Sequence, residues 1–352
     1  MKVLLGEISS YKAIVIAAYL KKTYPNIEVI TYDHRKYTNS IRTMFSDEHF
    51  FIDNTSFTNY INNLLELIKL HSIDFFLPVH SDYIGLILEN KELFGKSLDY
   101  IGNYETYQNL HNKEKLLQLA DELNIRIPRK YSNFQKAEFP FIGKPKEGSS
   151  AEGVVYIFSE TDLKKYSNRN FDNYIFQEYI EGIGCGYSVY AENGEIKSGY
   201  GHIRLAEFPI SGGSSVYRTG FFKREMRDVA EKILFETKWT GFAMFEFKLT
   251  PRNEIVLIEV NPRIWGSINQ GLQNGVNYFE SIFGESENTT QNSKNIKTYL
   301  SPQVYLAFLL YVFKGNLKPF LKFIKNIKYN KADISFWKDP KGWLSVILRK
   351  II

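Results

Sequence analysis

The sequence predicts a protein of mixed α/β and α+β class, with a doubly wound parallel sheet, a strand-rich centre and a helical C-terminal extension. Three observations predict this fold. Short apolar strands alternate with helical patterns over residues 1–105, strands succeed one another between about residues 139 and 261, and residues 300–352 are helical and basic. Alternating strands and helices are typical of a parallel sheet covered by helices.

The N-terminal part contains four short apolar segments of strand character. The expected strands are Val3–Leu5, Ile27–Ile30, Glu48–Ile52 and Phe75–Pro78. We expect a helix from about Tyr11 to Lys22, and apolar residues at positions 60, 61, 64, 65 and 68 have the spacing of a second helix. Gly6, Ser9 and Ser10 follow the first strand, where such sheets bind ligands. A dinucleotide site is not expected there, because the sequence lacks Gly-x-Gly-x-x-Gly.

The central part begins with a helix expected over Glu114–Leu123 and continues as strands joined by loops. A strand at 139–145 leads into a Gly/Ser loop at 146–153, and a strand at 154–158 follows at once. Such a loop exposes backbone N–H groups that can cradle phosphates, although most loops of this kind only connect hairpins. Further on, the pattern predicts a strand at 174–180, a hairpin turn at Glu192–Glu195 and a helix from about Lys223 to Thr237.

Two strand-like segments joined by the turn signal Thr250–Asn253 carry the most informative pattern. A hairpin centred on this turn places Glu246 directly opposite Glu259, with Asn261 on the same face and Val260 pointing away. Two opposed carboxylates destabilise a sheet unless positive charge lies between them. Three oxygen donors on one face suit a hard divalent cation such as Mg²⁺. A solvated face with Lys or Arg neighbours is the alternative.

Composition bounds the class of protein. The chain has 352 residues, of which 44% are hydrophobic, enough for a large core and two or three structural units. Its single cysteine, Cys185, excludes an internal disulfide framework and indicates a reducing compartment. Glu7 interrupts the first apolar run too early for a signal peptide, and no run approaches the roughly 20 apolar residues of a membrane span. We therefore expect a cytoplasmic protein.

Five features occur in a distinctive order along the chain. They are Lys113, Lys144 before the Gly/Ser loop, the run Gln177-Glu178-Tyr179-Ile180, Glu246, and the run Glu259-Val-Asn261-Pro-Arg263. Over roughly residues 1–285 this order resembles the ATP-grasp superfamily, especially its carbamoyl-phosphate-synthase-like, carboxylate–amine ligase branch. The resemblance implies an N-terminal pre-ATP-grasp domain at 1–105 and an ATP-grasp domain at 106–285, with a lid at about 113–177 and a gripping subdomain at about 178–285. A polar linker at 286–299 and the basic helical extension at 300–352 complete the chain.

The resemblance also implies a role for each matching residue, with ATP and Mg²⁺, or alternatively Mn²⁺, as cofactors. Lys113 and Lys144 match lysines that contact the ATP phosphates, and Arg263 matches an arginine that stabilises the transferred phosphoryl group. Glu246, Glu259 and Asn261 match the metal ligands. The remaining ATP contacts are expected from Gly148, Ser149, Ser150 and Gly153 in the closing loop and from Gln177, Glu178, Tyr179 and Ile180 on the adenine strand.

One departure from the family pattern concerns the ribose. Many members bind its hydroxyls with an acid in a Gly-x-Glu-x-Ser/Thr run, but here the run is Gly184-Cys185-Gly186-Tyr187-Ser188. Glu181 is the candidate substitute for that acid. A catalytic role for Cys185 is not expected, because no histidine accompanies it in a recognisable pattern.

The implied chemistry is ATP-dependent amide formation through an acyl phosphate. The partners are then a small-molecule carboxylate and an amine, such as an amino acid or a cell-envelope sugar. Substrate-contact candidates are Arg204, Glu207, Gly212, Gly213 and Ser214, with Ser9, Ser10 and the loop 79–82 lining the opposite wall. Two alternatives stay open, a small-molecule kinase and a non-catalytic ATP-binding scaffold at the membrane. A homodimer is compatible with the sequence, which does not fix the oligomeric state.

The C-terminal segment is strongly basic. Residues 311–352 contain nine Lys and one Arg against two Asp, a net charge of +8, so the first 310 residues sum to −3 within a total of +5. Nucleic-acid binding by this slightly acidic body is not expected. The apolar residues at 320, 321, 323, 324 and 327 alternate with lysines as in a basic amphipathic helix. Such a helix can lie on an anionic membrane, with Trp337 and Trp343 as anchors, or pack on the body with its lysines in water.

Overall fold

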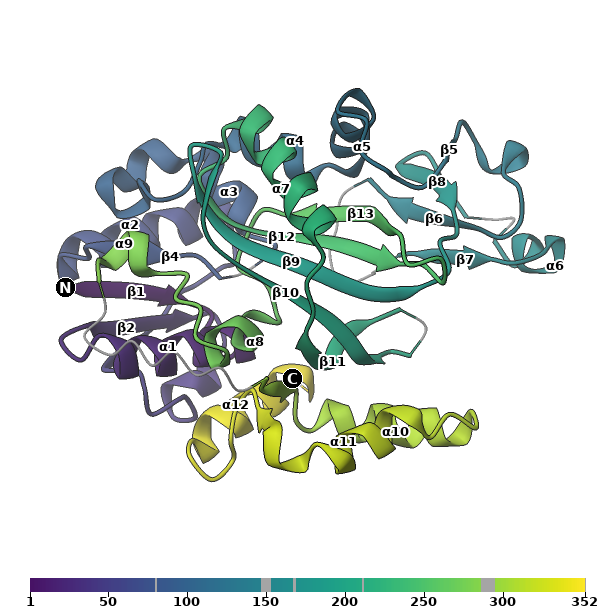
Figure 1. Cartoon of the computed structure of the whole chain (residues 1–352). Helices are drawn as coiled ribbons and strands as arrows, with labels where there is room; N and C mark the ends of the chain where they lie inside the picture. The colour runs from purple at the N-terminus through teal and green to yellow at the C-terminus, as the bar shows by residue number, and fades with distance from the viewer. Residues whose placement is uncertain (80, 147–152, 167–168, 211, 286–294, 352) are drawn as a thin grey trace.

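The computed structural model describes residues 1–79, 81–146, 153–166, 169–210, 212–285 and 295–351. These residues form three β-sheets, with helices between them and a layer of C-terminal helices along one edge (Figure 1). The predicted mixed α/β and α+β class is confirmed. No helix within the described ranges combines the length and the apolar character needed to cross a bilayer.

The N-terminal sheet is parallel and has four strands in the order β3-β2-β1-β4. Its elements are β1 (Lys2–Gly6), α1 (Tyr11–Thr23), β2 (Glu28–Asp33), β3 (Glu48–Phe51), α2 (Phe57–His71), β4 (Phe75–Leu77) and α3 (Ile84–Glu89). The predicted helix at 11–22 is therefore confirmed as α1, which the Ser10 hydroxyl caps by accepting from the Ala13 amide. The strand order reverses between β1 and β4, so the loops after these two strands flank the crevice where such sheets bind ligands.

A small antiparallel sheet, in the order β5-β8-β6-β7, follows two helices. These elements are α4 (Tyr104–His111), α5 (Lys113–Glu122), β5 (Lys130–Tyr131), β6 (Phe141–Pro145), β7 (Val155–Ile157), α6 (Glu160–Lys164) and β8 (Tyr174–Glu178). Phe141, Val155, Ile157 and Phe176 form a separate core on one face of this sheet. Alternation then turns Ile142 and Lys144 to its other face.

The largest sheet has seven strands in the order β13-β12-β9-β10-β11-β14-β15. Its strands are β9 (Ile183–Glu192), β10 (Glu195–Phe208), β11 (Ser214–Gly220), β12 (Gly241–Leu249), β13 (Ile255–Asn261), β14 (Lys297–Tyr299) and β15 (Asn330–Ala332). The helices α7 (Arg224–Thr237) and α8 (Ile268–Gln273) pack beside it, whereas α9 (Glu280–Phe283) lies beside the N-terminal sheet, where Phe283 contacts Phe75 of β4. The hairpin predicted at Glu192–Glu195 joins β9 to β10.

The segment predicted as a polar linker at 286–299 ends in a strand. Thr298 and Tyr299 of β14 pair with Arg218 and Tyr217 of β11, so the last residues of that segment belong to the large sheet. The β-branched and aromatic side chains at 296–299 favour this strand, although the many polar residues before them obscure it in the sequence.

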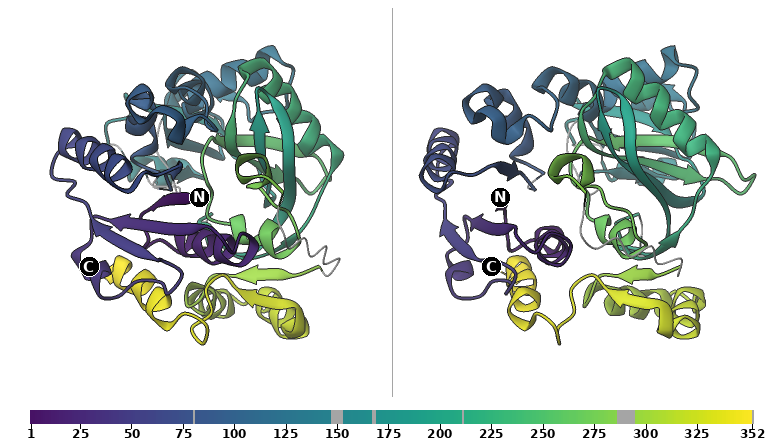
Figure 2. Two further views of the ribbon diagram at one scale, coloured as in Figure 1. Left: turned by 90° about the vertical axis from the view of Figure 1, so that its left-hand side faces the viewer. Right: turned by 60° about the vertical axis from the view of Figure 1, so that its left-hand side comes forward.

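The C-terminal helices pack against the body on one side. Helices α10 (Gln303–Phe313), α11 (Lys318–Lys325) and α12 (Pro340–Ile351) form one layer, and Figure 2 shows α12 beside the N-terminal sheet. A buried ion pair ties this layer to the large sheet, because Arg218 Nη2 donates to both carboxylate oxygens of Asp333 at 2.5 Å. The last helix is thereby positioned at the ligand-binding edge of the first sheet.

Candidate active site

The β12–β13 hairpin brings two carboxylates together. Glu246 pairs with Glu259 in the antiparallel register, and Met244 pairs with Asn261, as the sequence predicts. The Asn261 amide nitrogen donates to Glu259 Oε1 at 3.0 Å and to Glu246 Oε1 at 3.4 Å. Both carboxylates are half-buried, while Val260 on the opposite face is buried in the core. The face is half-buried and has Lys and Arg neighbours, so the metal site predicted at Glu246, Glu259 and Asn261 stays a prediction.

Positive side chains from other elements compensate the two carboxylates. Arg204 Nη2 of β10 donates to Glu246 Oε2 at 2.5 Å. Burial raises the pKa of Glu246, and Arg204 opposes that rise. Burial would also raise the pKa of Glu259, but Lys113 and Lys144 hold it below its ordinary value. The two glutamates therefore differ in environment, since one is paired with a guanidinium and the other faces two lysines.

The two lysines reach the hairpin from separate elements. Lys144 lies on β6, and Lys113 is the first residue of α5, whose amide donates to the Lys146 carbonyl at 3.0 Å. Both side chains are buried. Burial lowers the pKa of Lys144 to about 8, and Glu259 partly restores it. Its lowered pKa reflects an ammonium group with little solvent and incomplete compensation.

These side chains line one cavity of ≈ 760 Å³. Among the described residues, eight Lys and Arg side chains but only four Glu side chains line it. The positive residues are Lys12, Lys113, Lys144, Arg204, Lys248, Arg263, Arg349 and Lys350, and the negative ones are Glu178, Glu207, Glu246 and Glu259. An excess of positive charge within a concave, partly apolar wall favours an anionic ligand.

One end of the cavity has the character of a base-binding pocket. Glu178, Tyr179 and Ile180 line it at and beyond the end of β8, together with apolar side chains from neighbouring strands. These apolar residues are Ile142, Val154, Phe158, Phe247 and Ile258. Backbone polar groups at a strand end can hydrogen-bond the edge of a planar heterocycle, while the apolar side chains pack on its faces.

Residues 102–267 match a family model described as an ATP-grasp domain. This segment of the chain is an ATP-grasp domain. No curated protein matches the sequence at a significant level.

Solved ATP-grasp structures resemble the chain in fold at low identity. N5-carboxyaminoimidazole synthetase from Staphylococcus aureus, complexed with ADP, matches with a TM-score of 0.67 at 14% identity, covering 89% of this chain and 86% of that one. The biotin carboxylase domain of Hydrogenobacter thermophilus 2-oxoglutarate carboxylase, in complex with MgADP, ADP and bicarbonate, has a TM-score of 0.61 at 14% identity over 79% of this chain and 67% of that one. An L-amino acid ligase from Bacillus licheniformis has a TM-score of 0.61 at 12% identity, covering 83% and 75%.

The donor set of the ATP-grasp hairpin fits a divalent cation that shares its ligands with phosphates. Within the part of the chain that the structure describes, no group of three or more His, Cys, Asp or Glu could hold a metal ion alone. Glu246 and Glu259 supply two carboxylates, and Mg²⁺ usually completes such a set with water and phosphate oxygens. The Asn261 oxygen accepts from Arg263 Nη2 at 2.9 Å, so Asn261 links the carboxylate pair to Arg263.

Most predicted ATP-site residues lie at the cavity, but some do not. Gln177 is completely buried, and neither of its amide atoms has a hydrogen-bond partner in the described structure. Glu181 is exposed and does not line the cavity, nor does Gly153. Gly148, Ser149 and Ser150 lie outside the described residues.

Cys185 is unsuited to chemistry, as the sequence predicts. It is buried on β9, and burial raises the pKa of its thiol to about 12. The neutral thiol is a poor nucleophile.

The substrate-contact candidates also gather at the cavity. Arg204, Glu207, Gly212, Gly213 and Ser214 all line it. Arg204 is held in place on three sides, because Nη1 donates to Glu207 Oε1 and to the Gly213 carbonyl, both at 3.2 Å, while Nη2 reaches Glu246. Arg204 thus connects the Gly-rich loop to the carboxylate pair. Its predicted role in binding substrate stays a prediction.

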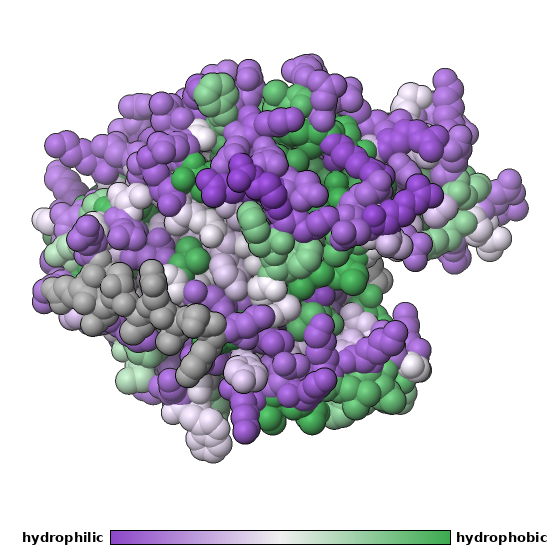
Figure 3. Space-filling view, viewed as in Figure 1, coloured by the Kyte–Doolittle hydropathy of each residue, from purple (hydrophilic) through white to green (hydrophobic). Residues whose placement is uncertain are grey.

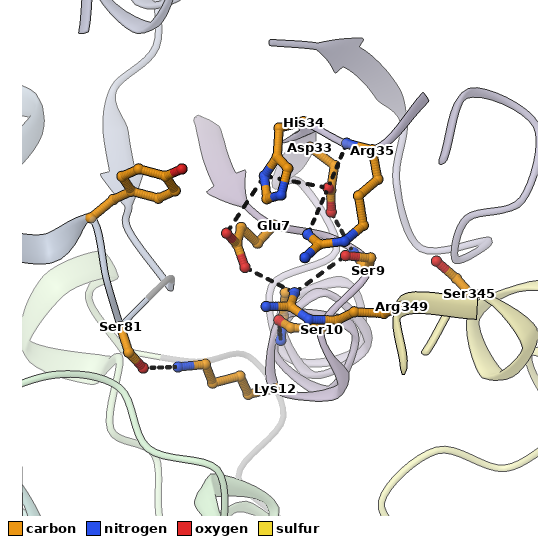
Figure 4. A network of polar contacts seen from close by, with 12 residues as sticks. Glu7, Ser9, Ser10, Lys12, Asp33, His34, Arg35, Ser81, Ser345 and Arg349 are labelled. Carbon is orange, nitrogen blue, oxygen red and sulfur yellow. Dashed lines mark hydrogen bonds and ion pairs between the residues drawn. The ribbon is translucent and has the colours of Figure 1, made fainter. Parts of the chain in front are cut away.

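The far end of the cavity contains residues that the sequence did not single out. Lys12 of α1 donates to Ser81 Oγ and to the Ile264 carbonyl, both at 3.4 Å, and Arg349 of α12 contacts Ser9 and Glu7 (Figure 4). Arg349 comes from a segment whose contacts the sequence could not reveal.

Lys248 also lines the cavity, and the sequence could have predicted it. It lies two residues beyond Glu246 on the same strand and so shares its face.

Proposed function

We propose that the protein is an ATP-dependent carboxylate–amine ligase that forms an amide through an acyl phosphate. One observation carries the proposal: a facing carboxylate pair, the buried Lys113 and Lys144, and Arg263 line a cavity that continues beyond them to a second cationic end. The first end suits a metal-bound triphosphate, and the second offers room for an acid to approach its terminal phosphate. Two of the fold neighbours are an N5-carboxyaminoimidazole synthetase and an L-amino acid ligase, which supports the same class.

The proposed roles follow from charge and position. Lys113 and Lys144 bind phosphate oxygens, and Glu178, Tyr179 and Ile180 hold the adenine. Glu246 and Glu259 would hold Mg²⁺ or Mn²⁺, which neutralises triphosphate charge when bound. Arg263, which Asn261 orients, offers its guanidinium to the transferred phosphoryl group. Phosphoryl transfer depends on such positioning and neutralisation more than on covalent help from the protein.

The reaction then proceeds in two balanced steps. A substrate carboxylate oxygen attacks the γ-phosphorus, the bond to the β-phosphate bridging oxygen breaks, and ADP leaves. An amine attacks the resulting acyl phosphate, loses a proton, and expels inorganic phosphate as the amide forms. Neither step requires a nucleophile from the protein, which agrees with a buried Cys185 whose thiol pKa is raised. Closure around the site is needed to keep water from the acyl phosphate.

A product-stoichiometry screen tests this proposal. Amino acids, amino sugars and uronic acids are offered in pairs with MgATP, and ADP and inorganic phosphate are both measured. The proposal expects ADP and free phosphate in equal amounts, strongly stimulated only when a carboxylate and an amine are both present. ADP without free phosphate would identify a kinase instead, and nucleotide binding without any turnover across the screen would favour a scaffold.

A further inference from the structure

Two further positive side chains, Lys12 and Arg349, lie close to Arg263 in the same cavity. Lys12 comes from α1, Arg263 follows β13, and Arg349 comes from α12. Lys12 lies against the residue that follows Arg263, since its ammonium donates to the Ile264 carbonyl at 3.4 Å. Figure 4 shows Lys12 and Arg349 on neighbouring sides of the start of α1, at the crevice where the parallel strands end.

Two members of this cluster, Lys12 and Arg263, are under-compensated, whereas Arg349 is paired with Glu7. Neither Lys12 nor Arg263 has a carboxylate within 4.0 Å among the described residues, and the buried Nε of Arg263 lacks a hydrogen-bond partner there. Arg349 Nη1 pairs with Glu7 Oε2 at 2.8 Å and donates to Ser9 Oγ at 3.2 Å. Burial, with help from Arg263 and Arg349, lowers the pKa of Lys12 well below its usual range, and the opposing effect of Asp82 is smaller. Because Lys12 and Arg263 lack a carboxylate partner among the described residues, this part of the cavity attracts an anion.

We propose that Lys12 and Arg349 bind a second anionic group of the substrate, a carboxylate or a phosphate, beyond the carboxylate that reacts at Arg263. This proposal rests on the proposed ligase function. The ammonium and the guanidinium, with the Ser81 hydroxyl beside Lys12, supply donors for several oxygens of one anion. Arg349 lies outside the matched ATP-grasp segment, so the last helix would give this chain its own substrate preference.

Calorimetric binding of simple anions tests the site. The full chain, saturated with Mg·AMP-PNP, is titrated with inorganic phosphate, malonate or acetate. We expect phosphate or malonate to bind more tightly than acetate, and Lys12→Met and Arg349→Met to weaken that binding by about tenfold or more. Lys22→Met on the exposed side of α1 and Lys341→Met on α12 are matched charge-removal controls that retain wild-type binding. Whether phosphate or malonate is preferred identifies the anion.

Two further readouts keep the outcomes distinct. Arg349→Lys keeps a positive charge opposite Glu7, so this variant recovers most anion binding if Arg349 binds the ligand. If Arg349 acts only structurally, the loss of anion binding in each variant parallels its loss of thermal stability. Equal anion binding in the wild type and in both methionine variants, or no response of the wild type to any dianion, would overturn the proposal. If the wild type does not bind AMP-PNP, that result would count against the ligase function itself.

A different observation concerns the outer face of the C-terminal layer. Helix α10 is apolar almost all round, and its inward residues Val304, Ala307 and Phe308 pack with Phe323 of α11 against the large sheet. Its outward side chains have no such cover: Phe313 is 78% exposed and Leu321 on α11 is 59% exposed. The exposed apolar residues are Tyr305, Leu306, Leu309, Leu310, Val312, Phe313, Leu317, Phe320, Leu321, Ile324 and Ile327. Hydrophobic side chains gather along this edge in Figure 3.

Lysines interleave with this apolar face. Lys314, Lys318, Lys322, Lys325 and Lys328 fall within residues 303–329, which contain no Asp or Glu. A second copy of the chain would bring the same positive charges together, so like-charge repulsion opposes self-association through this face. An anionic bilayer complements both the charge and the apolar side chains. We infer that α10 and α11 lie on the surface of an anionic membrane without crossing it.

Vesicle co-sedimentation of the full chain tests this inference. We expect binding to vesicles that contain phosphatidylglycerol, little binding to pure phosphatidylcholine, and release by high salt. The double variant Leu309→Ser, Phe313→Ser loses most binding, and so does the double variant Lys318→Gln, Lys322→Gln. The control Phe235→Ser alters another exposed aromatic, which lies on α7 and is 66% exposed, and this variant binds like the wild type. Equal sedimentation of all variants, or a concentration-dependent dimer that the Leu309 and Phe313 changes dissociate, would overturn the inference.

Discussion

Arg204 Nη2 and Glu246 Oε2 lie 2.5 Å apart, in a half-buried ion pair that joins the Gly-rich β10–β11 loop to the carboxylate hairpin. The same arginine contacts Glu207 and the Gly213 carbonyl, so one side chain couples the loop to the candidate metal ligands. Any change in the charge at Glu246 is therefore felt at the loop that lines the substrate part of the cavity.

Removing one partner of this ion pair should destabilise the protein more than removing both partners. We expect Arg204→Met to lower the free energy of unfolding by about 1–3 kcal/mol, because Glu246 is left half-buried without its partner. The double variant Arg204→Met, Glu246→Gln should recover much of that loss in a double-mutant cycle measured by urea denaturation. Arg224→Met, which breaks the exposed pair with Asp228, serves as the control and should change stability little. Additive effects of the two substitutions would contradict this coupling.

Nucleotide affinity should depend on pH through Lys144. Its pKa in the free protein is lowered to about 8, chiefly by burial, and phosphate oxygens would raise it in the complex. Below pH 8 Lys144 already carries its ammonium charge. Above pH 8 most of Lys144 is neutral, so nucleotide binding must be accompanied by uptake of a proton. The affinity for AMP-PNP should therefore fall as pH rises above about 8, by up to about tenfold per unit. Lys144→Arg should remove this dependence while keeping the charge, and an unchanged pH profile in that variant would refute the assignment.

Cys185 should be inert in the folded protein. Burial and a raised thiol pKa predict no reaction with a thiol reagent at neutral pH under native conditions and full reaction after unfolding in denaturant. Cys185→Ala should retain ATP turnover within about twofold, measured as ADP release. Rapid native labelling, or loss of turnover in the alanine variant with its fold intact, would show that the thiol is accessible or functional.

Local pattern was sufficient to predict the carboxylate hairpin. Strand alternation and the turn signal predicted the pairing of Glu246 with Glu259, and the structure confirms that pairing. Next to the turn, however, Leu249 pairs with Ile255, one residue away from the predicted register, and a β-bulge between the two parts of the hairpin restores the register at Glu246. The same two-residue alternation would have found Lys248. The parallel sheet was predictable for a similar reason, since strand and helix periodicity are properties of short segments.

Contacts between distant segments were not predictable in this way. Arg349 meets Glu7 across 342 positions of sequence, and Lys12 meets the Ile264 carbonyl across 252. Neither pairing leaves a periodic signal. Gln177 shows the opposite failure: it lies on the predicted strand, yet packing buries it completely behind the cavity wall. Position in a motif thus predicts the element, and only the packed structure shows which side chains reach the ligand space.

The most direct test of the ATP-grasp assignment is the metal dependence of nucleotide binding at the hairpin. Calorimetry would compare AMP-PNP binding with and without Mg²⁺ for the wild type, Glu246→Gln, Glu259→Gln and the control Glu225→Gln on the exposed start of α7. We predict that Mg²⁺ tightens binding in the wild type and in the control, and that each hairpin substitution removes most of this gain. A full Mg²⁺-dependent gain in Glu259→Gln would contradict the account.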